Sequence, residues 1–316
     1  MKIQYYKLHF TSAFHISSGG FADESADVTI HSDTLYSAIC CAMQLLYGED
    51  FVSGFIKRES VQISSCFPFK GEELFFPRPL FSSKQEIEDI NYAEFKQQKK
   101  AKFLSKEYFE AALNGSFDLK KYSEDLKSKG KYNFLEKEEI PRVTIDRVSN
   151  AASIFNFAQV KFVEGAGLYF MAQFDETGTY KKEFEAALRL LGDEGIGADN
   201  TVGKGLFELS SPATLEIKTP ENPTHYLLTS LYYPSDDEIS RLDGKKSYYD
   251  FLTRNGWSTA GTMDLRRLST RMLIPGSLLN ISVKGAIPKV LDRTTASTNY
   301  DIVRYGQTIA LPIVCK

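Results

Sequence analysis

The chain has 316 residues, of which 42% are hydrophobic and 25% are charged, a composition typical of globular proteins. Its formal net charge of −3 excludes a polycation that binds nucleic acid through its overall field, so any such binding requires local basic patches. No apolar run is long enough to span a bilayer, and the opening MKIQYYKLHF lacks the apolar core of a signal peptide. The four cysteines form no CxxC pair and indicate reduced, buried thiols; we therefore expect a cytoplasmic protein without a membrane partner.

The first third of the chain predicts strands around one long helix. Residues 2–10 alternate loosely and predict a strand. A helix follows from Ser32, which can serve as the N-cap, with Asp33 at the positive end of the helix dipole and Gly48 at the stop position. Its expected buried face has helical spacing and consists of Leu35, Ile39, Ala42 and Leu46. Strands are predicted near 60–69 and in ELFFPRPLF, where two prolines interrupt the second.

The middle of the chain predicts an insert and a long hairpin. Residues 83–137 are rich in lysine and glutamate, with the two charges interspersed, which predicts short helices in a largely solvated insert. Residues 140–173 predict a β-hairpin, with strands at 142–148 and 154–173 and a small polar tip between them. An amphipathic helix then ends at Gly192, and a glycine-rich loop leads into the strand GLFELS.

This order of elements predicts an α+β fold built from ferredoxin-like domains. Without the insert and the hairpin, the elements run strand, helix, strand, strand, helix, strand, which is the ferredoxin-like βαββαβ order. We assign residues 1–217 to this domain. Residues 218–316 repeat the order in a degraded form, without sequence similarity between the halves, and predict a second ferredoxin-like domain.

The glycine-rich loop, GDEGIGADNTVGKGLFEL from Gly192 to Leu209, predicts contact with an anion. A P-loop is excluded because five residues, not four, separate Gly197 from the Gly-Lys pair and no serine or threonine follows Lys204. The loop also follows a helix and precedes a strand, the reverse of the order in a P-loop or a Rossmann turn. Two interpretations remain: a connection that only turns the chain, or a backbone that lies against a sugar-phosphate chain.

The second interpretation gives the glycines a direct role. Without a Cβ, Gly203 and Gly205 would let the backbone approach RNA, and Lys204 would add one charge contact. Valine at either glycine is therefore expected to reduce RNA binding more than Lys204→Ala does.

Several segments taken in order resemble a known family. The loop ending in GKGLFEL resembles the C-terminal glycine-rich loop of the RAMP superfamily, the RNA-binding proteins of CRISPR systems. More specifically, the chain is similar to the fourth subunit of the type III-A Csm effector complex. The segments that carry this resemblance are FTSAFHISSGG, SDTLYSAI, FFPRPL, KKAKFLSKEYFEAAL, PRVTIDRVSNAA, GWSTAG, IPGSLL and YGQTIALPI. The loop departs from its relatives at Asp-Asn-Thr, where they often carry arginine or more lysine.

The resemblance implies a binding subunit rather than an enzyme. Members of this family hold the 5′ repeat-derived tag of the CRISPR RNA, cap one end of the backbone filament beside an adjacent RAMP subunit, and dock the large polymerase-like signature subunit. No catalytic residue, cofactor or metal is expected. The candidate RNA-binding residues are Gly195, Gly197, Asn200, Thr201, Gly203, Lys204 and Gly205 in the loop, His15, Ser17 and Ser32 in the N-terminal segments, Arg142 and Arg147 in the hairpin, and Arg266, Arg267 and Arg271 further on.

Two other functions stay open at this point. Some RAMP relatives that process RNA use a histidine near the position of His15, so a metal-independent RNA endonuclease is the alternative. General-base action would need a partner within hydrogen-bond reach of this histidine. The third interpretation is an interaction scaffold whose glycine-rich loop packs only against protein. Asp23, Glu24 and Asp33 are acidic, but a solvated loop and a helix start account for them without a metal.

Overall fold

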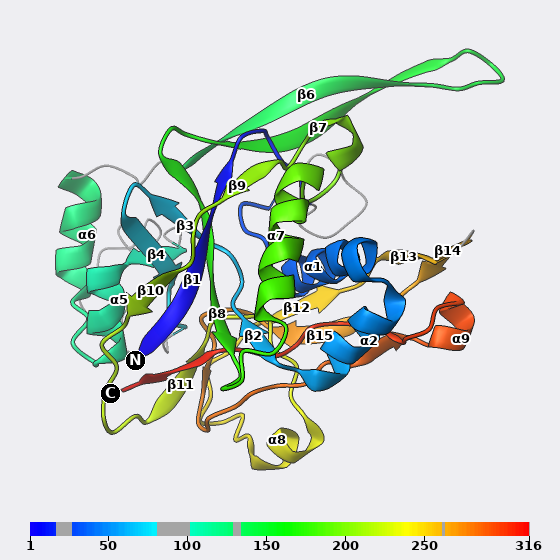
Figure 1. Ribbon diagram of the computed structural model, residues 1–316. Coiled ribbons are helices and arrows are strands. Elements are labelled where there is room, and N and C mark those ends of the chain that lie inside the picture. Colours follow the sequence, from blue (N-terminus) through cyan, green and yellow to red (C-terminus); the bar gives the residue numbers. More distant parts are fainter. Residues whose placement is uncertain (17–26, 81–101, 129–133, 261–262, 316) are drawn as a thin grey trace.

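The computed structural model describes residues 1–16, 27–80, 102–128, 134–260 and 263–315 (Figure 1). Its N-terminal sheet is built on β1 (Lys2–Phe10) and β8 (Ala166–Phe174), which pair antiparallel. β9 (Phe207–Leu209) pairs with the outer edge of β1, and β2 (Val61–Ile63) pairs with β8. The resulting antiparallel order β9–β1–β8–β2 is that of a ferredoxin-like sheet, as the sequence predicts.

Further strands widen this sheet on both sides. β10 (Ala213–Glu216) continues along β1, while β3 (Phe67–Lys70), β4 (Glu73–Pro77) and β5 (Phe103–Ser105) follow β8 in that order. The predicted single strand at 60–69 is therefore two strands, β2 and β3. It is interrupted because the amides of Ser65 and Cys66 donate to Thr229 and Ile30 instead of continuing the ladder.

Three helices cover one face of the sheet: α1 (Ser32–Tyr47), α2 (Glu49–Arg58) and α7 (Lys181–Glu194) (Figure 1). α1 ends at Gly48, whose φ of 83° is in the left-handed region, as predicted. Two details of the prediction are wrong. The N-cap is His31 rather than Ser32, and Leu46 is 43% exposed because α1 extends past the sheet that it covers.

The described part of the predicted insert packs on the opposite face and is not largely solvated. It contains α5 (Lys106–Leu113) and α6 (Leu119–Ser128). Phe109 is buried and stacks on Phe76 of β4 with ring centroids 4.4 Å apart, within a second hydrophobic core. The abundant charges lie on the outer face of α5 and conceal this apolar stripe in the sequence. Residues 83–101 and 129–133 of the predicted insert lie outside the described residues.

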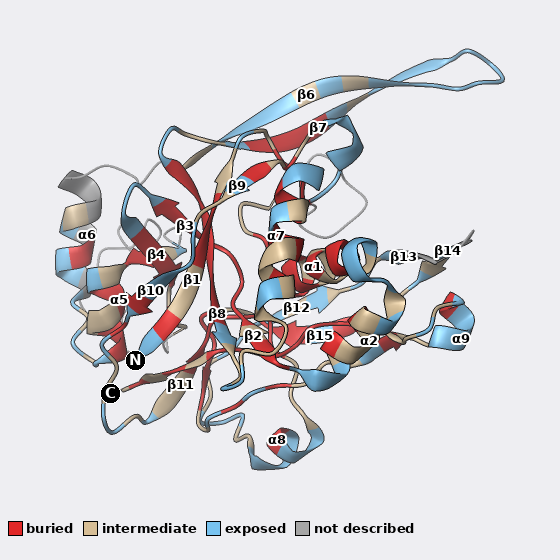
Figure 2. Ribbon diagram, in the orientation of Figure 1, coloured by how far each residue is buried: buried red, intermediate tan, exposed pale blue. Residues whose placement is uncertain are grey.

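The predicted hairpin is formed by β6 (Leu135–Ile145) and β7 (Ala152–Phe162), which pair along their whole length. It projects from the sheet, and its outer half is exposed (Figures 1 and 2). The predicted strand 154–173 is divided, because a turn with a positive φ at Gly165 separates β7 from β8. β8 belongs to the N-terminal sheet, whereas β6 and β7 form a separate two-stranded sheet.

The C-terminal part is centred on a three-stranded antiparallel sheet in the order β16 (Leu278–Leu279), β11 (His225–Leu228) and β19 (Ala310–Ile313). This order matches three of the four strands of a ferredoxin-like sheet. Its helices α8 (Asp236–Arg241) and α9 (Arg293–Ala296) are short. The remaining strands pair in twos and are β12 (Phe251–Arg254) with β15 (Thr270–Leu273), β13 (Trp257–Ala260) with β14 (Met263–Arg266), and β17 (Lys289–Leu291) with β18 (Ile302–Val303).

The structure bears on the predictions about membrane spans and cysteines. Among the helices of the described segments, none combines the length and the apolar character needed to cross a membrane. The cysteines are free thiols, but only Cys66 is fully buried and Cys41 is exposed, so the expectation that all four are buried is wrong. Burial raises the pKa of the Cys66 thiol well above its usual range.

Candidate RNA interface

The glycine-rich loop is joined by its backbone to the segment that follows β1. The amide of Ile196 donates to the carbonyl oxygen of Gly205 across the loop at 3.0 Å. The amides of Gly205 and Ala198 donate to Ala13 and His15, each at 2.9 Å. The last two hydrogen bonds join positions 192 and 183 residues apart in sequence and hold the loop against the segment after β1.

Most of these glycines allow two segments of the protein's own backbone to pack closely against each other. A Cβ at Gly195, Gly197 or Gly205 would lie 2.3, 2.4 or 2.1 Å from a backbone oxygen of Lys204, His15 or Ile196 respectively. All three also have a positive φ, which favours glycine. At Gly203, with a φ of 81°, a Cβ would meet nothing within 4 Å. Packing of the chain therefore accounts for three of the four candidate glycines, and of these four Gly203 alone faces open space.

The tip of the loop is an exposed 3₁₀ turn, η1 (Asn200–Val202). Asp199 before it and Gly203 after it are both in the left-handed region. The amide of Gly203 is used within the turn, where it donates to Asn200. Within the described part of the chain, the amides of Asn200 and Thr201 have no acceptor, so they are the donors left for a ligand.

The middle of the hairpin meets the loop around Phe157, which pairs with Ile140 halfway along the ladder. The guanidinium of Arg142 lies 3.9 Å from the centroid of this ring, and the Nζ atom of Lys204 lies 4.9 Å from it. The ring of His15 packs against the same phenylalanine, with centroids 4.5 Å apart. Three segments that the sequence analysis selected separately thus converge on one aromatic ring. We call this surface the loop–hairpin junction and define it by His15, Arg142, Phe157, residues 195–205 and Gln159.

The charges of this junction are largely balanced internally. Arg142 forms an ion pair with Asp199, while the Nζ atom of Lys204 donates to Gln159. Gln159 in turn donates to Glu138 at 2.8 Å. Burial, followed by repulsion from Arg142, lowers the pKa of Lys204. Two cations face two carboxylates here, so the junction offers directed hydrogen-bond donors more than net positive charge.

Of the remaining candidates, His15 is buried within the junction, and the others lie elsewhere. His15 is 2% exposed, and its Nδ1 atom lies 2.6 Å from the carbonyl oxygen of Ala158. Ser32 is buried, and its hydroxyl accepts a hydrogen bond from the amide of Leu231. Ser17 lies outside the described residues. Arg147 sits in the exposed turn at the far end of the hairpin, away from Arg142.

The three predicted arginines of the C-terminal part do not form one patch. Arg266 lies in β14 opposite Trp257, while Arg271 in β15 stacks on Phe251 with 4.6 Å between guanidinium carbon and ring centroid. Arg267 lies between these strands, and its amide donates to the carbonyl oxygen of Gly256. The cluster that is dense in sequence is therefore spread over two strand pairs.

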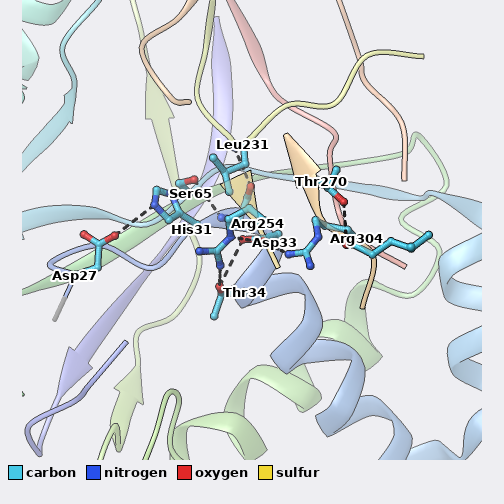
Figure 3. Close-up of polar contacts among 11 residues, drawn as sticks. Asp27, His31, Asp33, Thr34, Ser65, Leu231, Arg254, Thr270 and Arg304 are labelled. Carbon is cyan, nitrogen blue, oxygen red and sulfur yellow. Dashed lines mark hydrogen bonds and ion pairs between the residues drawn. The ribbon is translucent and has the colours of Figure 1, made fainter. Parts of the chain in front are cut away.

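A polar cluster that the sequence analysis missed lies at the start of α1 (Figure 3). The Oδ2 atom of Asp33 accepts from Arg254 and from Arg304, each at 2.9 Å, and Arg254 also donates to Thr34. Asp33 is 5% exposed and Arg304 is 4% exposed. Burial by itself would raise the pKa of Asp33, but the attraction of the two arginines outweighs it and holds the pKa below its usual value.

This cluster ties α1 to the C-terminal part of the chain. Its arginines come from β12 and from the segment after β18, 221 and 271 residues from Asp33. The sequence supplied only one signal, an aspartate in the first turn of a helix, and that signal is equally typical of an exposed helix start. In the described residues, no group of three or more histidine, cysteine, aspartate or glutamate side chains could hold a metal ion. Asp23 and Glu24 lie outside those residues.

Comparisons with known proteins agree along the whole chain. Residues 7–208 match the RAMP superfamily model, and residues 221–313 match the model described as the CRISPR Csm4 C-terminal domain. A curated relative from Thermococcus onnurineus, called CRISPR system Cms protein Csm4, is 27% identical over 89% of this chain and 91% of its own length. A Mycobacterium tuberculosis protein of the same name is 26% identical over 92% of each chain.

Two solved structures share the fold. One is a chain of a Csm1–Csm4 cassette in complex with cA4, with a TM-score of 0.67, 20% identity and complete coverage of both chains. The other belongs to a Csm3–Csm4 subcomplex of the type III-A CRISPR-Cas interference complex, with a TM-score of 0.64, 19% identity and 99% coverage of each chain. With a matched model over residues 7–208 and this fold, the chain belongs to the RAMP superfamily, and its C-terminal part matches that of Csm4.

Proposed function

We propose that the chain is a non-catalytic RNA-binding subunit of a type III-A CRISPR effector complex, and that it holds the 5′ repeat-derived tag of the CRISPR RNA on the loop–hairpin junction. The observation that carries this proposal is the convergence of the glycine-rich loop, the middle of the hairpin and the segment after β1 on Phe157. The exposed amides of Asn200 and Thr201 supply donors for phosphate oxygens. Arg142 and Lys204 supply charge-assisted donors beside them.

The same proposal includes two protein partners. The similar solved structures are a Csm1–Csm4 cassette and a Csm3–Csm4 subcomplex. We infer that this chain docks the large polymerase-like signature subunit and caps the backbone filament beside an adjacent RAMP subunit. Co-expression with each candidate partner, followed by gel filtration, tests these contacts separately from RNA binding.

Binding of tagged RNA to the junction is expected to depend only modestly on salt. Each phosphate contact on a single strand contributes about −0.7 to the slope of log K against log salt. Two cations at the junction, Arg142 and Lys204, therefore predict a slope of about −1.4 from this surface. Fluorescence anisotropy of labelled tagged RNA across a salt series measures it. A slope near zero would show that phosphate contacts do not hold the RNA.

The alternative enzyme, a metal-independent RNA endonuclease, would use His15. The structure favours a positioning role, since this side chain is buried, contacts the Ala158 carbonyl oxygen and packs on Phe157. A general base must instead reach the proton that it removes. We expect no cleavage of repeat RNA by the parent protein or by His15→Ala, and weaker RNA binding by the variant. Cleavage by the parent that His15→Ala abolishes would establish the enzyme in place of the binding subunit.

A further inference from the structure

Positive charge is in excess around Asp33. Besides its two partners, Arg254 and Arg304, a third arginine lies nearby, because the amide of Arg267 donates to Gly256, two residues after Arg254. Arg267 itself forms no ion pair with Asp33. Two guanidinium groups thus share the carboxylate of Asp33 and a third lies nearby, which leaves a local excess of two positive charges in a region where Arg304 is 4% exposed.

Several donors of this cluster lack an acceptor. Among the described residues, nothing accepts a hydrogen bond from the buried Nε and Nη2 atoms of Arg304 or from the buried Nε atom of Arg267. Guanidinium groups stay charged in proteins, and buried charged donors are costly to leave unsatisfied. Burial, followed by repulsion from Arg304, lowers the pKa of Arg267. An anion bound here would remove both the unsatisfied donors and the mutual repulsion.

An exposed aromatic residue follows Gly256 in the chain and pairs across the strands with Arg266. Gly256 packs closely on Arg267, since a Cβ on this glycine would lie 2.8 Å from the arginine Nη2 atom. The next residue, Trp257, is the single tryptophan of the chain and is 62% exposed. An exposed indole beside arginines is the combination that binds a phosphate and stacks on the neighbouring base of a single strand.

We propose that Arg254, Arg267 and Arg304 form a second phosphate-binding site, which takes a backbone phosphate of single-stranded RNA while Trp257 stacks on an adjacent base. The inference that this site binds a phosphate depends only on the arginine cluster. The inference that the phosphate belongs to RNA rests on the proposed function. Arginine forks bind phosphate oxygens through paired hydrogen bonds, which suits donors that already converge.

The test uses Arg267→Gln, which leaves both ion pairs of Asp33 in place. Arg241→Gln, at an exposed arginine on α8, is the matched control. In the first arm, thermal melting is followed with inorganic phosphate against chloride at equal ionic strength. Phosphate is expected to raise the melting temperature of the parent and of Arg241→Gln, and to raise that of Arg267→Gln by less than half as much. Equal shifts in all three proteins would overturn the site.

The second arm uses the fluorescence of Trp257 and a single-stranded RNA oligonucleotide. RNA is expected to quench this fluorescence in the parent, and inorganic phosphate is expected to compete with it. Arg267→Gln should weaken the affinity about tenfold and reduce the salt slope by about 0.7, the contribution of one phosphate contact. If phosphate stabilises the protein through Arg267 but RNA leaves the fluorescence unchanged, RNA as the source is wrong. If the parent binds no RNA by anisotropy either, the proposed function fails while the phosphate site stands.

Discussion

Replacing Asp33 with asparagine is expected to lower the free energy of unfolding by about 3–5 kcal/mol, because the change leaves the buried Arg304 and the partly buried Arg254 without their counter-ion. Both partners lie 2.9 Å from the same carboxylate oxygen, and Arg304 is as buried as Asp33 itself. Chemical denaturation of the parent and the variant measures this difference. The matched control is Glu107→Gln, which breaks an ion pair with Lys121 that is exposed on both sides. That pair should contribute less than about 1 kcal/mol.

The effect of Asp33→Asn should also depend on pH. Because the pKa of Asp33 is lower in the folded chain than in the unfolded one, its contribution is complete above the unfolded value of about 3.9. The contribution is lost as the pH falls through the lowered folded value. The difference in stability between parent and variant should therefore be constant from pH 5 to 7 and shrink below about pH 4. A difference that is small at pH 7, or that grows on acidification, would refute the role of this carboxylate as the tie between α1 and the C-terminal part.

Valine at Gly205 is expected to destabilise the protein far more than valine at Gly203. At Gly205 the new Cβ meets the backbone oxygen of Ile196 at 2.1 Å, and the residue must keep a φ of 75°. Strain in the left-handed region costs about 1–3 kcal/mol, and overpacking costs about 1–3 kcal/mol more. At Gly203 only the strain applies, since the space around it is open. Thermal melting of the two variants gives the ranking, and equal melting temperatures would contradict the packing of the loop.

Measuring RNA binding by the same variants distinguishes damage to the packing of the loop from obstruction of the bound RNA. Gly205→Val is expected to lose RNA binding through damage to the loop, so it does not test the approach of RNA. Gly203→Val stays folded and should bind tagged RNA more weakly than Lys204→Ala, whose lost cation contributes about 1 kcal/mol or less. If the folded Gly203→Val protein binds as well as the parent while Lys204→Ala does not, the loop acts through charge and the backbone-approach model is wrong.

The elements that the sequence predicted are those with a strong local period. β1 and α7 follow from alternation and from helical spacing, and Gly48 ends α1 where expected. α5 escaped detection as a buried helix because its apolar stripe, which includes Phe109, is short and surrounded by lysine and glutamate. The division of 60–69 into two strands depends on Thr229 and Ile30, which are distant in sequence.

The candidate site was predicted in outline rather than in contact detail. The glycine-rich loop, Arg142 and His15 were selected separately, and the structure brings them together around Phe157, which no local pattern identifies. The reason for Gly195, Gly197 and Gly205 could not be read from the sequence, since the backbone that fills their space includes His15, about 180 residues away. The arginine cluster was missed for the same reason: Arg254 and Arg304 are isolated in sequence and meet only through Asp33.

Ultraviolet cross-linking of the chain to RNA that carries a repeat-derived 5′ tag tests the central claim most directly. The cross-linked peptides, identified by mass spectrometry, are expected to come from residues 195–205 and from the middle of the hairpin around Phe157. RNA of the same length with a scrambled 5′ end should cross-link there more weakly. Equal cross-linking of both RNAs, or cross-links confined to other surfaces, would contradict the assignment of the loop–hairpin junction as the binding site of the tag.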